Sequence, residues 1–121
     1  MSEVVAVLGA TPQEDRYVNR AVKLLLAKGY TVVPVNPRYT EVEGIRCYPS
    51  FSGYAGTIDT VTVYVNSQTA LASSNDIISA KPKRVILNPG TEHPLLKQRL
   101  ADAGINVIEG CTIVMLNTGQ F

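Results

Sequence analysis

The feature that most constrains this 121-residue chain is its alternation of short β-branched runs with segments of helical periodicity. The apolar runs predict strands at residues 3–8, 31–35, 60–65, 84–87 and 105–108. Their nearly continuous apolar character is typical of strands buried on both faces. Because helical stripes separate them, the sequence predicts an α/β fold: a doubly wound, mostly parallel sheet within three layers (α/β/α).

The predicted helices differ in the strength of their pattern. From Tyr17 to Lys28 apolar residues recur on one face, and Gly29 can end that helix in the left-handed conformation. A weaker stripe covers residues 70–78, where serine and asparagine lower the helix propensity. A third helix is predicted to begin at Thr91 as its cap and to end before Gly104.

Three segments have less decisive patterns. Gly44–Tyr48 is interpreted as a short edge strand, and Pro49–Gly56 as a loop or a single turn. Residues Gly110–Leu116 are apolar and fit either a short helix or a strand. No linker or low-complexity stretch interrupts the chain, so we predict one domain over residues 1–121.

Composition and charge exclude several classes of function. The net charge is +1 and no block of lysine or arginine is present, so no nucleic-acid partner is expected. No apolar run approaches the length of a membrane span, and residues 1–8 lack the features of a signal peptide. We therefore expect a cytoplasmic protein that does not bind membranes. With two cysteines and one histidine, no metal site is expected.

The first predicted strand is followed by Gly9-Ala10-Thr11, a loop that leads into the first helix. In a parallel sheet the carboxyl ends of the strands lie along one edge, where ligands bind. The free backbone N–H groups of such a loop can form an anion site for a pyrophosphate. Thr11 can add a hydroxyl hydrogen bond, and Arg16 lies near enough to the helix start to reach a phosphate.

The second predicted strand ends in Asn36-Pro37-Arg38. A dinucleotide-binding fold that accepts NAD carries Asp or Glu at this point to hold the ribose 2′-OH. Here that carboxylate is missing, and Arg38 can attract a phosphate on the ribose. Asn36 can offer both a donor and an acceptor to a ribose. The pattern favours a nucleotide with an extra ribose phosphate, either coenzyme A or NADP.

Two further strand ends contribute candidate residues. Val65 and Asn66 follow the 60–65 run, where an apolar wall can pack against adenine. Asn88-Pro89-Gly90 follows the 84–87 run and repeats the Asn-Pro pair found at residues 36–37. Gly90 permits the backbone to approach a ligand closely. Both Asn-Pro pairs are expected along the same edge of the sheet.

The sequence offers no catalytic residues. His93 falls in a predicted surface helix, and no serine, cysteine or carboxylate is placed beside it by spacing, so no triad can be argued. Cys111 can face the crevice, but no residue is identified that would activate it as a nucleophile.

Together these residues resemble the CoA-binding domain family, small stand-alone proteins similar to the N-terminal domain of the succinyl-CoA synthetase alpha subunit. The most specific segment runs from Gly29-Tyr30 through Val35-Asn36-Pro37-Arg38. The match continues in order along nearly the whole chain, from Val7-Leu8-Gly9-Ala10-Thr11-Pro12, Arg16-Tyr17 and 21–25 to Gly44-Ile45-Arg46-Cys47-Tyr48-Pro49-Ser50, Asn88-Pro89-Gly90, Ala103-Gly104 and Cys111.

The resemblance implies a Rossmann-like fold that holds CoA along the strand ends. Gly9, Ala10 and Thr11 would face the phosphates, and Asn36, Pro37 and Arg38 would surround the ribose with its 3′-phosphate. The remaining channel would be lined by Val65, Asn66, Asn88, Pro89 and Gly90. The chain departs from the family at Asn66-Ser67-Gln68, where basic residues with a proline are common, and at Lys81-Pro82-Lys83, where a glycine is usual. The synthetase's catalytic histidine lies in a second domain, which has no counterpart here.

The sequence-based hypothesis is a protein that binds CoA or an acyl-CoA, a small-molecule nucleotide cofactor, without a catalytic centre of its own. One alternative is an NADP-binding oxidoreductase-like domain. Another is a Rossmann-fold scaffold or interaction protein that has lost its ligand. Homo-oligomerisation stays open at this stage.

Overall fold

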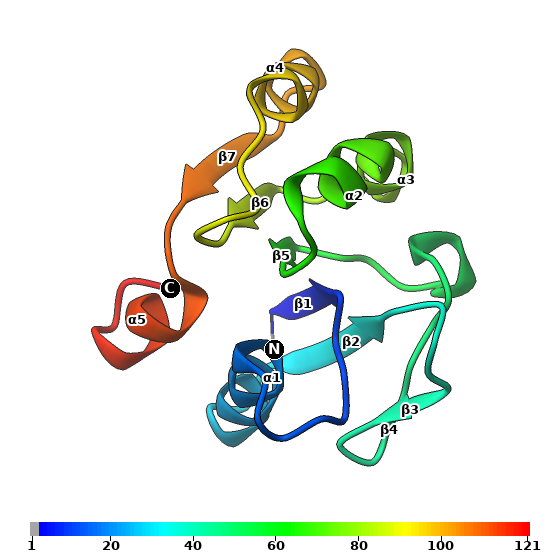
Figure 1. Cartoon of the computed structure of the whole chain (residues 1–121), viewed down its shortest axis with the longest axis vertical. Helices are drawn as coiled ribbons and strands as arrows, with labels where there is room; N and C mark the ends of the chain where they lie inside the picture. Colours follow the sequence, from blue (N-terminus) through cyan, green and yellow to red (C-terminus); the bar gives the residue numbers. More distant parts are fainter. Residues whose placement is uncertain (1–2) are drawn as a thin grey trace.

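The computed structural model describes residues 3–121 and contains a sheet of five parallel strands (Figure 1). The strands are β1 (Val4–Leu8), β2 (Thr31–Val35), β5 (Thr60–Val63), β6 (Arg84–Leu87) and β7 (Asn106–Glu109). Their order is β2-β1-β5-β6-β7, with every neighbouring pair parallel. The predicted parallel α/β sheet is confirmed, and the strand expected at 60–65 ends two residues early.

Helices cover both faces of this sheet, as the doubly wound prediction requires (Figure 1). One face carries α1 (Tyr17–Ala27) and α5 (Thr112–Asn117). The other carries α2 (Ser67–Ala72), α3 (Ser74–Ala80) and α4 (Pro94–Asp102). Because side chains alternate along a strand, Val5 and Val7 pack with α1, whereas Ala6 and Leu8 join the core beneath α2, α3 and α4.

The strand order places a crevice at one defined point of the sheet. From β1 the chain moves outward to β2 and then returns to the other side of β1 as β5. Connections that leave the central strands in opposite directions leave a gap above their carboxyl ends. The loops that follow β1, β2 and β5 surround that gap.

The segment expected to be an edge strand at Gly44–Tyr48 does not join the main sheet. Its strand, β4 (Ile45–Arg46), pairs in an antiparallel hairpin with β3 (Glu41–Val42), and only Tyr48 bridges to β2. The cause is the turn at Glu43 and Gly44, whose φ angles of 51° and 76° fold the segment back on itself. The single turn predicted within Pro49–Gly56 is confirmed as η1 (Phe51–Gly53).

Pro34 lies within β2, which is an edge strand, and this position explains why proline is tolerated there. Its carbonyl accepts from the Tyr48 N–H at 2.9 Å, and the Tyr48 carbonyl accepts from the Asn36 N–H at 2.9 Å. Tyr48 and Val35 thereby form an isolated parallel bridge. The chain after the hairpin is fastened along the outer side of β2.

Two helix predictions require correction. The stripe at 70–78 is split into α2 and α3 at Ser73, consistent with its low helix propensity. Thr91 does not cap α4, because its hydroxyl donates instead to the Asn88 carbonyl at 2.7 Å. His93 is the cap: its Nδ1 accepts from the Leu95 N–H at 3.1 Å, and Pro94 opens the helix.

Two expectations about helix ends are resolved by the structure. Gly29 follows α1 with a φ of 87°, which confirms its role in ending that helix. The ambiguous 110–116 segment forms α5, with Leu116 in the core and Val114 exposed. Within residues 3–121, no helix has both the length and the apolar character needed to cross a membrane.

Charged residues at the amino ends of the strands pair with one another. The Arg84 guanidinium lies 3.2 Å from a Glu3 carboxylate oxygen, donates to the Thr60 hydroxyl at 2.9 Å and stacks over the Phe121 ring. The Asp59 carboxylate accepts from the Val4 N–H at 2.8 Å and lies 3.3 Å from the Lys83 ammonium. The hydrogen bond from Val4, with a smaller contribution from Lys83, lowers the pKa of Asp59. At the amino ends of the strands, these charged side chains therefore find their partners within the protein.

Candidate functional site

A crevice of about 630 Å³ opens at the carboxyl ends of β1, β2 and β5, with α3 along one wall. A volume of this size is typical of small-molecule and cofactor sites. The crevice brings together residues predicted from three separate segments. They are Gly9, Thr11 and Arg16 after β1, Asn36, Pro37 and Arg38 after β2, and Val65 and Asn66 after β5.

Gly9 is required at the first turn for two reasons. Its φ of 93° is a conformation that side chains disfavour. A Cβ at this position would also lie 2.9 Å from Val65 Cγ1 and 3.0 Å from the Tyr64 carbonyl oxygen. The Gly9 N–H donates to the Val35 carbonyl at 2.9 Å and so ties the loop to β2. The glycine thus serves close packing between β1, β2 and β5.

The loop after Gly9 contains backbone donors that the fold does not use. No group of residues 3–121 accepts a hydrogen bond from the N–H of Ala10 or Thr11. Ala10 is fully buried in the core and does not line the crevice, so of these two residues it is Thr11 that reaches the crevice. The Thr11 hydroxyl accepts from the Gln13 N–H at 3.2 Å. Unused N–H groups ahead of a helix suit an anion such as a phosphate.

Asn36 holds two loops together, a structural role that the sequence did not predict. Its amide donates to the Ala10 carbonyl at 2.9 Å, and its side-chain oxygen accepts from the Arg38 N–H at 2.9 Å. One N–H and one lone pair of the amide are engaged in this way, which leaves one of each for a ligand. Asn36 positions the Gly9 loop and the backbone of Arg38, although its surface still contributes to the crevice.

Two guanidinium groups line the crevice without a counterion. Arg16 and Arg38 are both exposed, and neither belongs to any ion pair found among residues 3–121. Exposed arginines without partners remain free to form charge-assisted hydrogen bonds with a phosphate. Asp76 on α3 is the acidic residue of the described crevice wall. The crevice therefore combines cations near β1 and β2 with an acid on the helical side.

The fourth predicted segment, Asn88-Pro89-Gly90, lies outside this crevice. Asn88 is buried: its amide donates to the Thr62 hydroxyl at 2.7 Å and to the Val63 carbonyl at 2.9 Å, and its oxygen accepts from the Thr112 N–H at 2.9 Å. Pro89 and Gly90 are exposed, but β6 is one strand further from the switch point than β5. Asn88, like Asn36, fastens the end of its strand to the neighbouring strand.

Sequence reasoning missed several residues of the crevice wall, of which Tyr64 and Asp76 are the most informative. The Tyr64 hydroxyl is buried and has no hydrogen-bond partner within the described part of the chain. Its burial, together with the nearby Cys111 thiol, raises the pKa of Tyr64 to about 12. The predicted strand ran to residue 65, so Tyr64 was placed inside it, whereas β5 ends at Val63. Asp76 could not have been found from the sequence, because only the packing of α3 brings it to the crevice.

The remaining candidates for chemistry lie away from this wall. His93 caps α4 and Cys111 precedes α5, and neither lines the crevice. No group of three or more His, Cys, Asp or Glu side chains that could hold a metal ion occurs in residues 3–121. The arrangement is suited to binding an anionic ligand.

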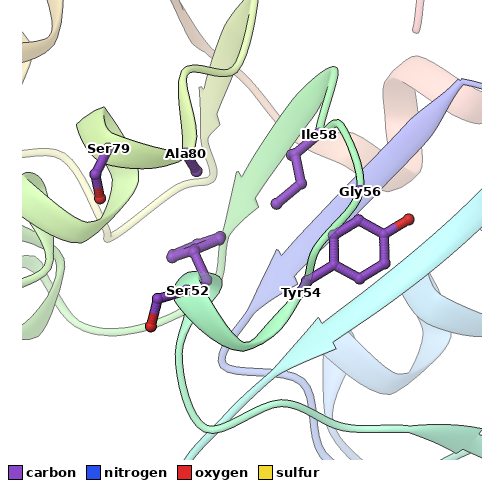
Figure 2. Close-up of a pocket in the computed structure, with 7 residues that line it drawn as sticks. Ser52, Tyr54, Gly56, Ile58, Ser79 and Ala80 are labelled. Carbon is purple, nitrogen blue, oxygen red and sulfur yellow. The ribbon is translucent and has the colours of Figure 1, made fainter.

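A second, smaller hollow of about 260 Å³ lies between the loop before β5 and the end of α3. Tyr54 and Ile58 enter it from the loop, and Ser79 and Ala80 from the helix (Figure 2). All of its lining residues are uncharged. It is therefore less suited to a phosphorylated ligand than the crevice at the strand ends.

Comparisons with known proteins agree with this geometry. A family model described as a CoA binding domain matches residues 3–117. The ADP-forming acetate–CoA ligase I of Archaeoglobus fulgidus is 41% identical over 63 residues, which are 52% of this chain and 9% of the ligase. The chain thus matches less than a tenth of that curated relative.

Solved structures share the fold over more of the chain. A crystal structure of an uncharacterized protein has a TM-score of 0.89 and 40% identity, covering 100% of this chain and 99% of that one. The dinucleotide-forming acetyl-coenzyme A synthetase 1 of Ca. Korarchaeum cryptofilum, in complex with phosphate and ADP, has a TM-score of 0.78 and 26% identity. That match covers 87% of this chain and 25% of the synthetase.

Proposed function

We propose that this chain, which belongs to the CoA-binding domain family, binds coenzyme A or an acyl-CoA in the crevice at the strand ends. The observation that carries the proposal is the unpaired Arg38 guanidinium at the end of β2, where an NAD-binding fold would present a carboxylate. Arg38 would bind the 3′-phosphate of the CoA ribose.

The rest of the crevice supports this assignment. The unused N–H group of Thr11, with Arg16 nearby, would bind the pyrophosphate. Val65 and Pro37 would provide apolar surface for the adenine. None of the residues lining the crevice forms a recognisable nucleophile and base pair. The proposed role is therefore to bind the cofactor without turnover.

Substitution of Arg38 tests the proposal directly. We expect Arg38→Ala to weaken CoA binding about tenfold or more, because a hydrogen bond to a charged group is worth about 1.5–3 kcal/mol. Binding of 3′-dephospho-CoA should change little. Both affinities can be measured by titration calorimetry. Arg20→Ala is the matched control, since it removes an arginine of α1 whose side chain packs over the Tyr17 ring.

Equal losses for the two ligands would remove Arg38 from the ribose-phosphate role. A thermal-shift series with CoA, acetyl-CoA, NADP and NAD separates the competing cofactors. Ligand at 100 times its Kd should add about 2.7 kcal/mol of stability. Stronger binding of NADP than of CoA would favour an oxidoreductase-like domain, and the absence of any shift would favour a scaffold without a ligand.

A further inference from the structure

Asp76 lines the crevice, and one of its two carboxylate oxygens has no hydrogen bond within the described residues. One oxygen accepts from the Phe51 N–H at 3.2 Å, which holds the side chain between η1 and α3. No ion pair of residues 3–121 includes Asp76. The carboxylate has about four lone-pair positions and no donor of its own. A ligand in the crevice can therefore donate a hydrogen bond to it.

The wall beside Asp76 suits a flat, largely apolar ring. Pro49, Pro37 and Val65 contribute apolar surface to the same crevice. The nearby polar groups are partly engaged: the Ser73 hydroxyl donates to the Thr69 carbonyl at 2.9 Å, and the Asn66 side chain caps α2 by accepting from the Thr69 N–H at 2.9 Å. A wall that combines apolar side chains with a carboxylate is suited to a heterocycle that carries an amino group.

The negative charge of Asp76 determines whether the phosphate or the base of a ligand can lie beside this wall. A phosphate placed here would be repelled by Asp76 and attracted to Arg38 and Arg16 on the other elements of the crevice. The exocyclic 6-amino group of adenine is a hydrogen-bond donor, and aspartate is a suitable acceptor for base amino groups. A 6-oxo purine presents an acceptor at the same position and would face the carboxylate unfavourably.

We propose that Asp76 is a specificity-determining residue that accepts a hydrogen bond from the adenine 6-amino group of the bound cofactor. This inference rests on the proposed CoA site and identifies the base that the site selects. Asp76 is held in position by Phe51 and α3, so its orientation does not depend on the ligand.

The test compares CoA with its deaminated analogue, in which hypoxanthine replaces adenine. The protein should bind CoA about tenfold or more tightly than the analogue. In Asp76→Asn the amide oxygen can still accept from the Phe51 N–H, while its NH₂ group offers a donor to the ligand. We expect this variant to lose the preference for CoA or to reverse it. Asp102→Asn is the control, because Asp102 lies at the exposed end of α4.

Each outcome of the calorimetric titration is informative. Equal affinity of the unsubstituted protein for CoA and the analogue would overturn the role of Asp76 while leaving CoA binding intact. The same would follow if Asp76→Asn kept the full preference for CoA. If neither ligand bound the unsubstituted protein, both the proposed function and this inference would be wrong. A lost or reversed preference in Asp76→Asn, with the preference kept in Asp102→Asn, would support the role of Asp76. A purely structural role would instead weaken the binding of both ligands equally.

Discussion

The charged side chains at the amino ends and at the carboxyl ends of the strands, here called the amino and carboxyl edges of the sheet, differ in whether they are paired. At the amino ends of the strands, Arg84 pairs with Glu3 and Lys83 with Asp59. At the carboxyl ends, Arg16 and Arg38 line a crevice and have no such partners within residues 3–121. The same sheet is closed by its own side chains at one edge and leaves its cations available at the other.

The two edges also differ in how their backbone is held. The carboxyl edge is fastened by buried or tightly packed groups: Gly9 lies against Tyr64 and Val65, Asn36 holds Ala10, and Asn88 holds β5 and α5. A binding edge needs a rigid backbone, because free charges are useful only when they are well positioned. At this edge the short amide side chains maintain the structure, and the long cationic side chains remain available to a ligand.

The largest effect should come from Gly9→Val. It combines an unfavourable φ with a Cβ that would lie 2.9 Å from Val65, and the expected loss of unfolding free energy is about 4 kcal/mol. Gly29→Val is the matched control near the amino edge, because Gly29 has a φ of 87° but no atom near its missing Cβ. Urea denaturation of both variants measures the difference. Equal losses would show that the carboxyl edge is packed no more tightly than the other.

Asn88→Ala should have the next largest effect, a loss of about 3 kcal/mol of unfolding free energy. The substitution removes two donated bonds and leaves the Thr112 N–H without its partner in a buried site. Asn106→Ala, at an exposed position at the start of β7, should cost less than about 0.5 kcal/mol. CoA affinity, measured below the unfolding transition, should be unchanged in Asn88→Ala. If Asn88→Ala lost CoA affinity while it remained folded, the ligand contact predicted for Asn88 from the sequence would be supported instead.

Tyr64 makes the carboxyl edge sensitive to alkaline pH. Its pKa is about 12 in the folded protein, whereas the ordinary pKa of a tyrosine is 10.0, so only the unfolded chain loses this proton between those values. Stability is therefore fully present below pH 10 and falls as the pH rises towards 12, by about 2 kcal/mol. The difference in unfolding free energy between the protein and Tyr64→Phe should show this slope. Curves that remain parallel from pH 9 to pH 12 would contradict it.

The smallest effect compares two arginines. Arg84→Ala should lower the unfolding free energy by about 1 kcal/mol, since it removes a partly exposed pair with Glu3 and a stacking contact with Phe121. Arg38→Ala should change stability by less than about 0.5 kcal/mol, because its guanidinium pairs with nothing in the described chain. Thermal unfolding without ligand measures both. A larger loss for Arg38 would mean that the two edges do not differ as described.

Local patterns were enough to predict the sheet and about half of the residues that line the crevice. The strands and α1 follow from apolar periodicity, and the positions of Gly9, Thr11 and Arg38 follow from where parallel strands end. The pairing of the 41–46 hairpin was not predictable, because it depends on a left-handed turn that includes Glu43, a residue that rarely adopts it.

The functions of individual side chains were harder to predict because they depend on tertiary partners. Asn88 is a residue type that often contacts ligands, yet both of its amide N–H groups are used within the buried structure. Asp76 reaches the crevice only because α3 packs there and Phe51 holds it. Residue type indicates which chemistry is available, whereas the fold decides whether that chemistry is used internally.

Pro34 in β2 has a consequence for self-association by strand addition. Its carbonyl faces the outer side of the sheet and is taken by Tyr48, and proline has no N–H to offer an incoming strand on that side. An extended segment from another molecule would therefore find a poor hydrogen-bonding template along β2. The opposite border, at β7, lacks such a block, so any cross-molecular β-pairing or aggregation of the folded protein is expected to start there.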